Sequence, residues 1–374
     1  MAGIYIHIPF CKKACHYCDF HFSTSLKNKD AMVDAICKEI ELRKDYVGTK
    51  EISTLYFGGG TPSLLNYSDI ISIISKIKTH FVLTQDIEIT LEANPDDLDK
   101  EKIAELKAAG INRLSIGVQS FFDEDLLLMN RSHTSEQAIT AICEAKKAGF
   151  NNISIDLIYG LPNLTIERWK NNLQKAFELD VPHLSSYSLT VEKRTALYNF
   201  VQKKKIILPD ESLVIEQFGL LMEEAKKNGF IHYEISNFCK DGMYSKHNSS
   251  YWKNEYYLGI GPSAHSYNGS SRQWNISSNA LYIDKIKNRD TWFEKEELSE
   301  EDRFNEYVMT RLRTIWGIDM DFVKSNFGED TFKLLLQQSQ PYIASGHLQH
   351  EEENVFLTQK GKLLADKIAA ELFI

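Results

Sequence analysis

The sequence predicts an α/β protein: a partial, open parallel β/α barrel of about six repeats, followed by a small C-terminal helical or winged-helix-like domain. Two observations indicate the barrel. Short segments typical of strands recur over the first two thirds of the chain, with helical periodicity between them. A glycine-capped helix end followed by a short strand also repeats at Gly110, Gly149 and Gly229, and parallel strands need such helical crossovers.

The expected strands follow one another in chain order. The first alternates Ile4, Ile6 and Ile8 with other residues before Pro9, which is the period of a half-buried strand. Apolar residues then recur at helical spacing over residues 32–40, before the second strand begins. Strands are expected near residues 4–8, 53–57, 87–93, 113–118, 152–158 and 184–189, with one more near 231–236.

The chain divides into three expected regions. Residues 1–236 hold the barrel repeats. Residues 237–299 form a connecting segment that is rich in Tyr, Trp, Ser, Asn and Gly, and the repeat pattern fails there. Residues 300–374 alternate charged and apolar residues at helical spacing, which predicts the small C-terminal domain.

The composition excludes several classes of protein. The 374 residues are 43% apolar and 25% charged, with 19 Gly and 8 Pro, which excludes disordered and fibrous chains. The formal charge of −9 disfavours nucleic acid as a partner, because phosphate binding needs clustered cations. No apolar run reaches the ~18 residues of a spanning helix, and the first ten residues lack the pattern of a signal peptide. We therefore expect a cytoplasmic protein.

A cluster of cysteines is the strongest chemical signal. Six cysteines are too few for a disulfide scaffold, yet Cys11, Cys15 and Cys18 fall within eight residues. An iron–sulfur cube normally takes four thiolates. With three local ligands, either a distant cysteine completes the set or one iron stays open for a small molecule, and the open iron is favoured. A zinc site that also uses His7, His16 or His21 is the alternative.

Further polar residues and glycines fall where successive strands end. Barrel folds carry their chemistry in the loops after the carboxyl ends of the strands, so these residues are expected to converge. The cysteines follow the first strand, the run Gly58-Gly59-Gly60-Thr61 follows the second, and Glu92, Gln119 and Asp156 lie near the ends of the third, fourth and fifth.

These residues carry a resemblance to a known family. The stretch from Tyr5 to Cys18, with the glycine run through Pro62, resembles the radical S-adenosylmethionine (SAM) superfamily, and within it the oxygen-independent coproporphyrinogen oxidase group. The resemblance extends over roughly residues 3–270. It implies that the three cysteines hold a [4Fe–4S] cluster whose open iron is chelated by SAM. The SAM-binding residues that it implies are Tyr5, Tyr17, Gly59, Gly60, Thr61, Glu92, Gln119, Arg131 and Asp156.

Within that group, two departures favour the HemW-type haem chaperones over the oxidases. The oxidases have a further cysteine two residues after the third, where this chain has Phe20, and they have a longer stretch before the cluster. The residues His247, Asn248, Tyr251 and Trp252 are also similar to an element of HemW-type proteins that is associated with haem binding. An imidazole can ligate haem iron, and aromatic rings offer apolar surface to a macrocycle.

Alternatives to this haem site and to this function stay open. An aromatic loop with one histidine can simply close a barrel mouth, and His265 is a second candidate for the axial ligand. The resemblance implies a haem chaperone that carries [4Fe–4S], SAM and haem and delivers haem to respiratory haem proteins, expected at the membrane surface. It also suggests a homodimer. An oxygen-independent coproporphyrinogen III oxidase is the alternative, with a zinc-stabilised barrel as a third hypothesis. No catalytic residue is assigned, and enzymatic turnover is left open.

Overall fold

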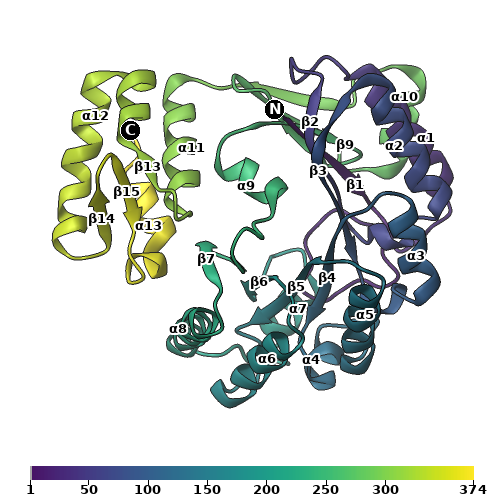
Figure 1. Ribbon diagram of the computed structural model, residues 1–374, viewed down its shortest axis with the longest axis horizontal. Coiled ribbons are helices and arrows are strands. Elements are labelled where there is room, and N and C mark those ends of the chain that lie inside the picture. Colours follow the sequence, from purple (N-terminus) through teal and green to yellow (C-terminus); the bar gives the residue numbers. More distant parts are fainter. Residues whose placement is uncertain (1) are drawn as a thin grey trace.

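Six parallel strands form the centre of the computed structural model, which describes residues 2–374 (Figure 1). Each of these strands pairs in parallel with the next one along the chain, and the sheet curves into an open barrel. The predicted six-strand open barrel is therefore confirmed. The strands are β1 (Ala2–Ile8), β2 (Glu51–Gly59), β3 (Val82–Ala93), β4 (Arg113–Gln119), β5 (Asn152–Tyr159) and β6 (His183–Ser188).

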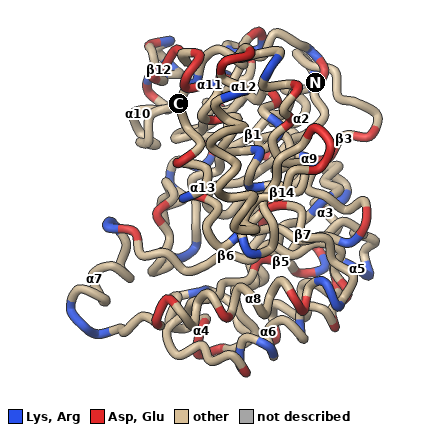
Figure 2. The backbone as a smooth tube through the Cα atoms, turned by 90° about the vertical axis from the view of Figure 1, so that its left-hand side faces the viewer, with Lys and Arg blue, Asp and Glu red and all other residues tan. Residues whose placement is uncertain are grey.

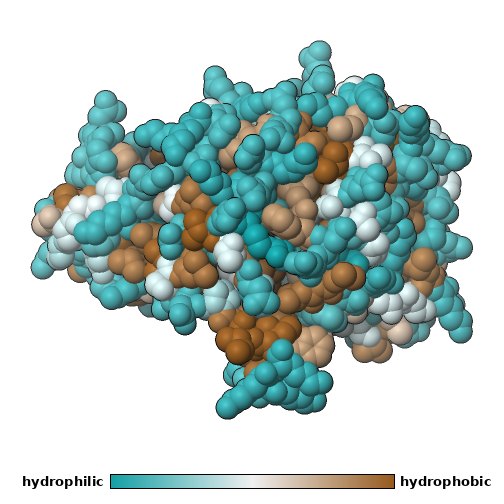
Figure 3. Space-filling view, turned by 90° about the horizontal axis from the view of Figure 1, so that it is seen from below, coloured by the Kyte–Doolittle hydropathy of each residue, from teal (hydrophilic) through white to brown (hydrophobic). Residues whose placement is uncertain are grey.

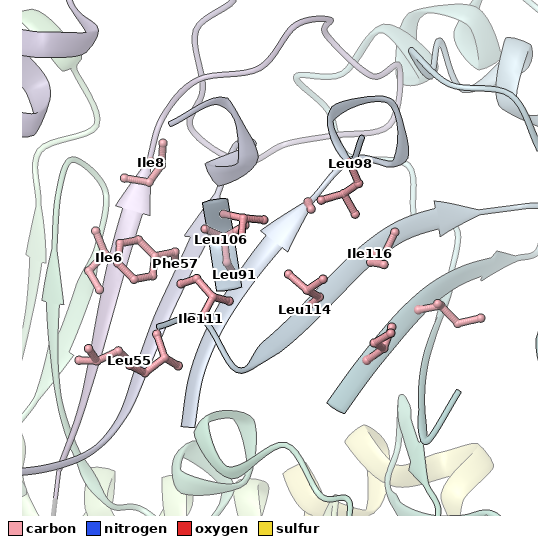
Figure 4. Packing of buried hydrophobic residues seen from close by; sticks show 14 of the residues in the cluster. Ile6, Ile8, Leu55, Phe57, Leu91, Leu98, Leu106, Ile111, Leu114 and Ile116 are labelled. Carbon is pink, nitrogen blue, oxygen red and sulfur yellow. The ribbon is translucent and has the colours of Figure 1, made fainter. Parts of the chain in front are cut away.

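Crossover helices cover the convex face of this sheet. Amphipathic patterns and side-chain caps define them; α5, for example, begins at a capping box formed by Thr134 and Gln137. Ile6, Phe57 and Leu114 point from the strands into the layer between sheet and helices (Figure 4). The helices are α1 (Lys29–Leu42), α2 (Tyr67–His80), α3 (Lys100–Ala108), α4 (Asp123–Leu128), α5 (Ser135–Lys147) and α6 (Ile166–Glu178), with short 3-10 turns η1 (Pro62–Leu64) and η2 (Pro95–Asp97).

The chain after β6 adds strands to both edges of the same sheet. Antiparallel β7 (Ile231–Glu234) and β8 (Asn237–Cys239) extend it beyond β6. At the other edge β9 (Tyr256–Ile260) pairs in parallel with β1, and three antiparallel strands follow. These are β10 (His265–Tyr267), β11 (Ser271–Asn275) and β12 (Phe293–Glu297); the accompanying helices are α7 (Ala196–Gln202), α8 (Glu211–Lys227), α9 (Lys246–Trp252) and α10 (Asn279–Asn288).

The C-terminal part has a core of its own. Phe304, Leu335 and Val355 are buried in it, and α12 bends at Gly328, whose φ is 88°. Main-chain hydrogen bonds from Ile235 to Arg313 and from Ile315 to Tyr233 join this core to β7. Its elements are α11 (Glu300–Leu312), α12 (Met320–Ala344), α13 (Ala365–Glu371), η3 (Gly361–Leu364), β13 (Ile318–Asp319), β14 (Leu348–Glu351) and β15 (Asn354–Leu357).

Within residues 2–374, no helix is both long enough and apolar enough to cross a lipid bilayer.

A buried carboxylate ties α1 to the sheet extension. Glu39 is fully buried and accepts hydrogen bonds from the amide of Gly261 at 2.8 Å, from Asn275 Nδ2 at 2.7 Å and from Trp292 Nε1 at 2.9 Å. The hydroxyl of Tyr282 donates to it as well. Because a buried charge is tolerated only when it is fully hydrogen-bonded, this residue fixes the β9–β12 extension against the helix layer.

Glu39→Ala should destabilise the protein by about 3 kcal/mol or more, because it leaves several buried donors without an acceptor. Urea unfolding monitored by circular dichroism measures this loss. Asp34→Ala, which removes an exposed carboxylate from the same helix, is the control and should change stability by less than about 0.5 kcal/mol. Equal effects of the two substitutions would contradict the role given to Glu39.

Candidate cofactor site

The cysteine loop leaves the carboxyl end of β1 and is held at its base by main-chain bonds. The amide of Cys11 donates to the carbonyl of Ser23 at 3.0 Å, and the amide of Ser23 donates to that of Pro9 at 2.9 Å. Cys11, Cys15 and Cys18 are partly buried, and none forms a disulfide. The loop therefore presents three free thiols at the end of the barrel where the predicted site lies.

The thiols are close enough for their charges to interact. Burial raises the pKa of Cys11 to about 11, and the charges of Cys18 and Cys15 add to the rise. A hydrogen bond with Thr61 has the opposite, smaller effect. Burial raises the pKa of Cys18 as well. Metal ligation requires thiolates, so loading this site must release protons.

The donor set fits an iron–sulfur cluster. Within residues 2–374, no three His, Cys, Asp or Glu side chains converge closely enough to hold a single metal ion. In a four-iron cube each thiolate binds a different iron, so three soft donors in one loop can serve without meeting at a point. Cys11, Cys15 and Cys18 are the residues that would hold such a cluster.

Arg131 lies between α4 and α5 and links the cysteine loop to the ends of β3 and β4. Its Nη1 lies 3.4 Å from Cys15 Sγ, and its Nη2 donates to Asn94 Oδ1 at 2.7 Å and to the carbonyl of Gly117 at 2.8 Å. Its Nε is buried without a partner. The guanidinium thus supplies positive charge to a site that becomes anionic when the thiols ionise. Its predicted contact with a SAM carboxylate stays a prediction.

The glycine run packs against β1. The amides of Gly60 and Thr61 donate to the carbonyls of Ile8 at 2.9 Å and Phe10 at 2.6 Å. A Cβ atom on Gly60 would lie 2.6 Å from the Phe10 carbonyl oxygen, and one on Gly59, whose φ is 104°, would lie 2.6 Å from the ring of His7. The absence of side chains at Gly59 and Gly60 is therefore needed for packing against the chain itself, whatever ligand approaches.

The strands separate polar from apolar residues by their alternation. Residues at every second position face the helices and are apolar, whereas the intervening residues face the interior of the barrel, here called the lumen. The lumen face carries Gly3, Tyr5 and His7 from β1; Thr54, Tyr56 and Gly58 from β2; Glu88, Thr90 and Glu92 from β3; Arg113, Ser115 and Gly117 from β4; Asn152, Ser154 and Asp156 from β5; and His183, Ser185 and Tyr187 from β6.

Two lumen carboxyls have perturbed ionisation. Burial raises the pKa of Glu92 to about 7, although the Tyr56 hydroxyl donates to its Oε1 at 2.8 Å, and burial raises the pKa of Asp156 to about 6. Asp156 lies inside β5 and not at its end, because that strand continues to Tyr159. Because folding raises both pKa values, ionising either carboxyl destabilises the ligand-free protein. For Glu92 this loss of stability takes place as the pH rises from 4.5 to about 7.

The remaining predicted SAM residues lie around the same end of the barrel. Gln119 ends β4 with a left-handed backbone conformation (φ 68°), which residues other than glycine rarely adopt. Tyr5 reaches His7 Nδ1 through its hydroxyl at 3.1 Å. Tyr17 packs against the barrel core, where burial raises its pKa. The structure thus brings these residues into the region of the cysteine and glycine loops.

His247 lies inside the barrel, on α9. Its Nδ1 is hydrogen-bonded to Thr54 Oγ1 at 2.7 Å and its Nε2 to the hydroxyl of Tyr251 at 2.9 Å. Its ring stacks on that of Tyr56 with centroids 4.9 Å apart, and burial lowers its pKa to about 3. Thr54 is near the amino end of β2, so the histidine sits towards the floor of the lumen, away from the cysteine loop.

The other residues of the predicted haem element are divided between two sides of α9. Tyr251 faces the lumen through its bond to His247, whereas Arg313 of the C-terminal part lies 5.6 Å from the Trp252 ring centroid. The backbone amide of Asn248 donates a hydrogen bond to Oγ of Ser245, the residue that caps the start of α9. His265 is exposed on β10 and stacks with Trp274 at 6.2 Å. The structure brings His247 and Tyr251 together, and it places Trp252 elsewhere.

Several residues of the lumen were not predicted from the sequence as part of the site. Tyr56 bonds Glu92, Glu88 accepts the amides of Lys246 and His247 at 3.1 Å, and Arg113 is fully buried beside them. A signal for them exists. Parallel strands buried on both faces are usually continuously apolar, so polar residues at every second position indicate a polar interior.

Glu92→Gln should flatten the pH dependence of SAM binding between pH 6 and 8. A ligand ammonium or hydroxyl that needs the Glu92 carboxylate binds more tightly as the pH rises through its pKa of about 7. The reconstituted wild type should therefore bind SAM about ten-fold more weakly at pH 6 than at pH 8 in isothermal titration calorimetry.

Glu101→Gln, which changes an exposed carboxylate on α3, is the control for this experiment and should keep the wild-type slope. The same slope in Glu92→Gln would remove Glu92 from the SAM site.

Comparisons with known proteins agree with this geometry. Residues 5–176 match the model of the Radical SAM superfamily, which covers the cysteine loop, the glycine run and strands β1–β5. Residues 298–364 match the HemN C-terminal domain. Together these matches include the barrel that carries the site and the separate C-terminal core.

Relatives and a solved structure cover nearly the whole chain. It is 36% identical to the Heme chaperone HemW of Bacillus subtilis, over 98% of each chain, and 34% identical to that of Lactococcus lactis, over 97% of this chain and 95% of the relative. The solved coproporphyrinogen III oxidase HemN of Escherichia coli, a radical SAM enzyme, superimposes with a TM-score of 0.85 at 25% identity, over 100% of this chain and 90% of the enzyme. The chain belongs to the HemW family of radical SAM proteins.

Proposed function

We propose that this protein is a cytoplasmic haem chaperone that carries a [4Fe–4S] cluster, binds SAM and delivers haem to other proteins. The observation that carries the proposal is the similarity to proteins named Heme chaperone HemW along almost their entire length. The barrel, the lumen and the C-terminal part are all included in that similarity, so it concerns the whole architecture and not one motif.

The residues divide between the two cofactors by their chemistry. Cys11, Cys15 and Cys18 would hold the cluster, which supplies single electrons to SAM when both are bound. The glycine run offers bare backbone to SAM, and Glu92 and Asp156 offer carboxylates. Arg131 contributes a fixed positive charge next to Cys15. Tyr5, Tyr17, Gln119 and Thr61 complete the proposed SAM pocket.

The oxidase is the second candidate, and the fold alone favours it because HemN is so similar in structure. Phe20 argues against it. This side chain is 73% exposed beside the cysteine loop, and it provides no thiol where the oxidase pattern has one. An exposed aromatic ring offers apolar surface to a macrocycle or to a partner protein. Residue 20 therefore supports the carrier.

His247 is the proposed axial ligand of the haem. Metal-bound histidines usually hold their second ring nitrogen in a hydrogen bond that fixes the ring, and Thr54 is placed to do this at Nδ1. Nε2 becomes available when the Tyr251 hydroxyl moves away. The low pKa of the ring keeps it neutral, as ligation requires.

Delivery to respiratory haem proteins at the membrane surface is the remaining part of the proposal. The chain between β6 and α8, residues 189–210, projects from the body and is here called the α7 arm (Figure 2). It carries exposed Lys203, Lys204 and Lys205, followed by Ile207, which is 84% exposed. The same projection stands at the lower edge of Figure 3, with apolar side chains at its base and hydrophilic ones at its tip. Clustered lysines beside an exposed apolar residue are suited to an anionic lipid surface.

The arm is also connected to the cluster loop. The amide of Leu197 donates to the carbonyl of His16 at 2.8 Å, and the ring of Phe200 packs edge-on against that of His16 with centroids 5.0 Å apart. A surface bound by the arm would therefore lie close to the cofactor end of the barrel.

The carrier and the oxidase make opposite predictions in an anaerobic assay. After reconstitution with iron and sulfide, the protein should take up haem stably and should yield no decarboxylated product from coproporphyrinogen III, SAM and a reductant. Absorption spectra and product chromatography measure the two properties. Product formation with multiple turnovers would overturn the proposal. Sedimentation of the same samples reports whether a homodimer forms, as the resemblance suggests.

Cys15→Ser is the variant that tests the cluster in this assay, and its iron content and its absorption near ~400 nm should be lost because a ligating thiolate is removed. Cys143→Ser removes a partly buried thiol from α5 and is the matched control, with iron content unchanged.

Replacing Lys203, Lys204 and Lys205 together by Gln should weaken binding to phosphatidylglycerol-containing vesicles by at least about ten-fold, because each lysine near an anionic surface contributes about 1 kcal/mol. Flotation of the reconstituted protein with vesicles measures this. Replacing the exposed Lys100, Lys170 and Lys287, which lie on other elements, is the control and should change little. Equal binding by all three proteins, or no binding by the wild type, would contradict the role of the arm.

A further inference from the structure

Arg113 is a buried cation without a close counter-ion. It begins β4, and because Leu114 and Ile116 point into the helix layer, its side chain lies on the lumen face (Figure 4). It is 1% exposed, and its Nε and Nη1 are sealed from solvent without a hydrogen-bond partner. No carboxylate oxygen of residues 2–374 lies within 4.0 Å of the guanidinium. Buried guanidinium groups are strongly disfavoured unless they are paired, so this one indicates a partner that the chain itself does not supply.

Two acids interact with Arg113 through their charges and also have other polar neighbours. The charge of Arg113 reaches Glu92 and Asp156, which lie on the strands at either side of it. Glu92, however, accepts the Tyr56 hydroxyl at 2.8 Å. The hydroxyls of Ser185 and Ser115 favour the ionised form of Asp156 and oppose the rise of its pKa. These carboxyls act on the guanidinium through space and leave its donors free.

A second polar group without a partner lies beside Arg113. Glu92 and Asp156, on the two neighbouring strands, are partly exposed. Thr90 and Asn152 are its register partners on β3 and β5, and Asn152 Oδ1 is also buried without a partner. Unsatisfied polar groups from two neighbouring strands thus meet at the floor of the lumen.

The proposed haem ligand lies at the same floor. His247 is near enough to Arg113 for the guanidinium charge to disfavour its protonation. In Figure 1 the helix that carries it, α9, lies within the curve of the sheet. A ligand with a metal centre and carboxylate side chains could therefore meet both residues, since a guanidinium presents paired donors that match a carboxylate.

We propose that Arg113 forms an anion subsite at the floor of the lumen and binds a carboxylate of the cargo, a propionate of haem, through its free guanidinium donors. This inference rests on the proposed function as a haem chaperone. In this proposal a propionate of the haem pairs with Arg113, and the haem iron binds His247. Glu92 and Asp156, which are proposed to bind SAM, do not contact the haem.

Haem and haem dimethyl ester distinguish this proposal directly, because the ester has the same ring and iron but no carboxylates. The reconstituted wild type should bind haem at least about ten-fold more tightly than the ester, as expected for a charge-assisted hydrogen bond. Arg113→Met should bind both with the same affinity, and Arg113→Lys should keep part of the preference. Absorption titrations measure all of these affinities.

Lys170→Met, which removes an exposed positive charge from α6, is the control and should keep the full preference. Circular dichroism and the iron content of each reconstituted variant report whether the fold is intact. If Arg113→Met does not fold, the ester comparison in the wild type and in Arg113→Lys still decides the question.

The possible outcomes distinguish a failure of the Arg113 subsite from a failure of the proposed haem-chaperone function. A wild type that binds neither compound overturns the proposed function. Equal binding of haem and its ester by the wild type, or a preference that survives in Arg113→Met, overturns the subsite and leaves the chaperone proposal standing. If Arg113→Met loses SAM affinity and keeps the preference for haem, the anion is the carboxylate of SAM, and the subsite proposal is wrong.

Discussion

Two main-chain hydrogen bonds hold the cofactor loops side by side, and the geometry of the site depends on them. The amides of Gly60 and Thr61 bond the chain at Ile8 and Phe10, at the point where it leads into the first cysteine. Any side chain at residue 60 would collide with those carbonyls. The loops after β1 and β2 are thereby fixed by backbone contacts, which are more rigid than contacts between long side chains.

The alternation of residues along the strands gives the barrel two chemically different faces. The outward residues build the apolar core, whereas the inward ones bring carboxyls, imidazoles and a guanidinium into a half-enclosed space. Burial there raises the pKa of Glu92 and lowers that of His247. The same partial desolvation strengthens every interaction with a charged ligand. Cofactor chemistry at one end and proposed cargo recognition at the floor thus share one electrostatic environment.

The sequence predicts the parallel strands well because each is bounded by local signals, a glycine-capped helix before it and a turn after it. The additional edge strands could not be predicted in this way. The pairing of β9 with β1 joins segments that are distant in sequence, and strands as short as His265–Tyr267 carry little periodicity. For the site, the motif residues were recognisable, whereas Arg113 was not: alternating polar residues in a buried parallel strand indicate a polar interior, but they do not show which of these residues lacks a partner. The bond that holds His247 at Nδ1 comes from Thr54, a contact across 193 residues that the local sequence does not reveal.

The position of β1 has a consequence for biogenesis. This strand is synthesised before both of its partners, since it lies in the sheet between β2 and β9, and β9 begins only at Tyr256. During translation one edge of β1 therefore stays open until more than half of the chain has emerged, and an open edge invites aberrant pairing. The cysteine loop continues directly from this strand. Iron–sulfur assembly factors would meet a finished receptor only late in synthesis, so metallation is expected to follow folding and not to guide it.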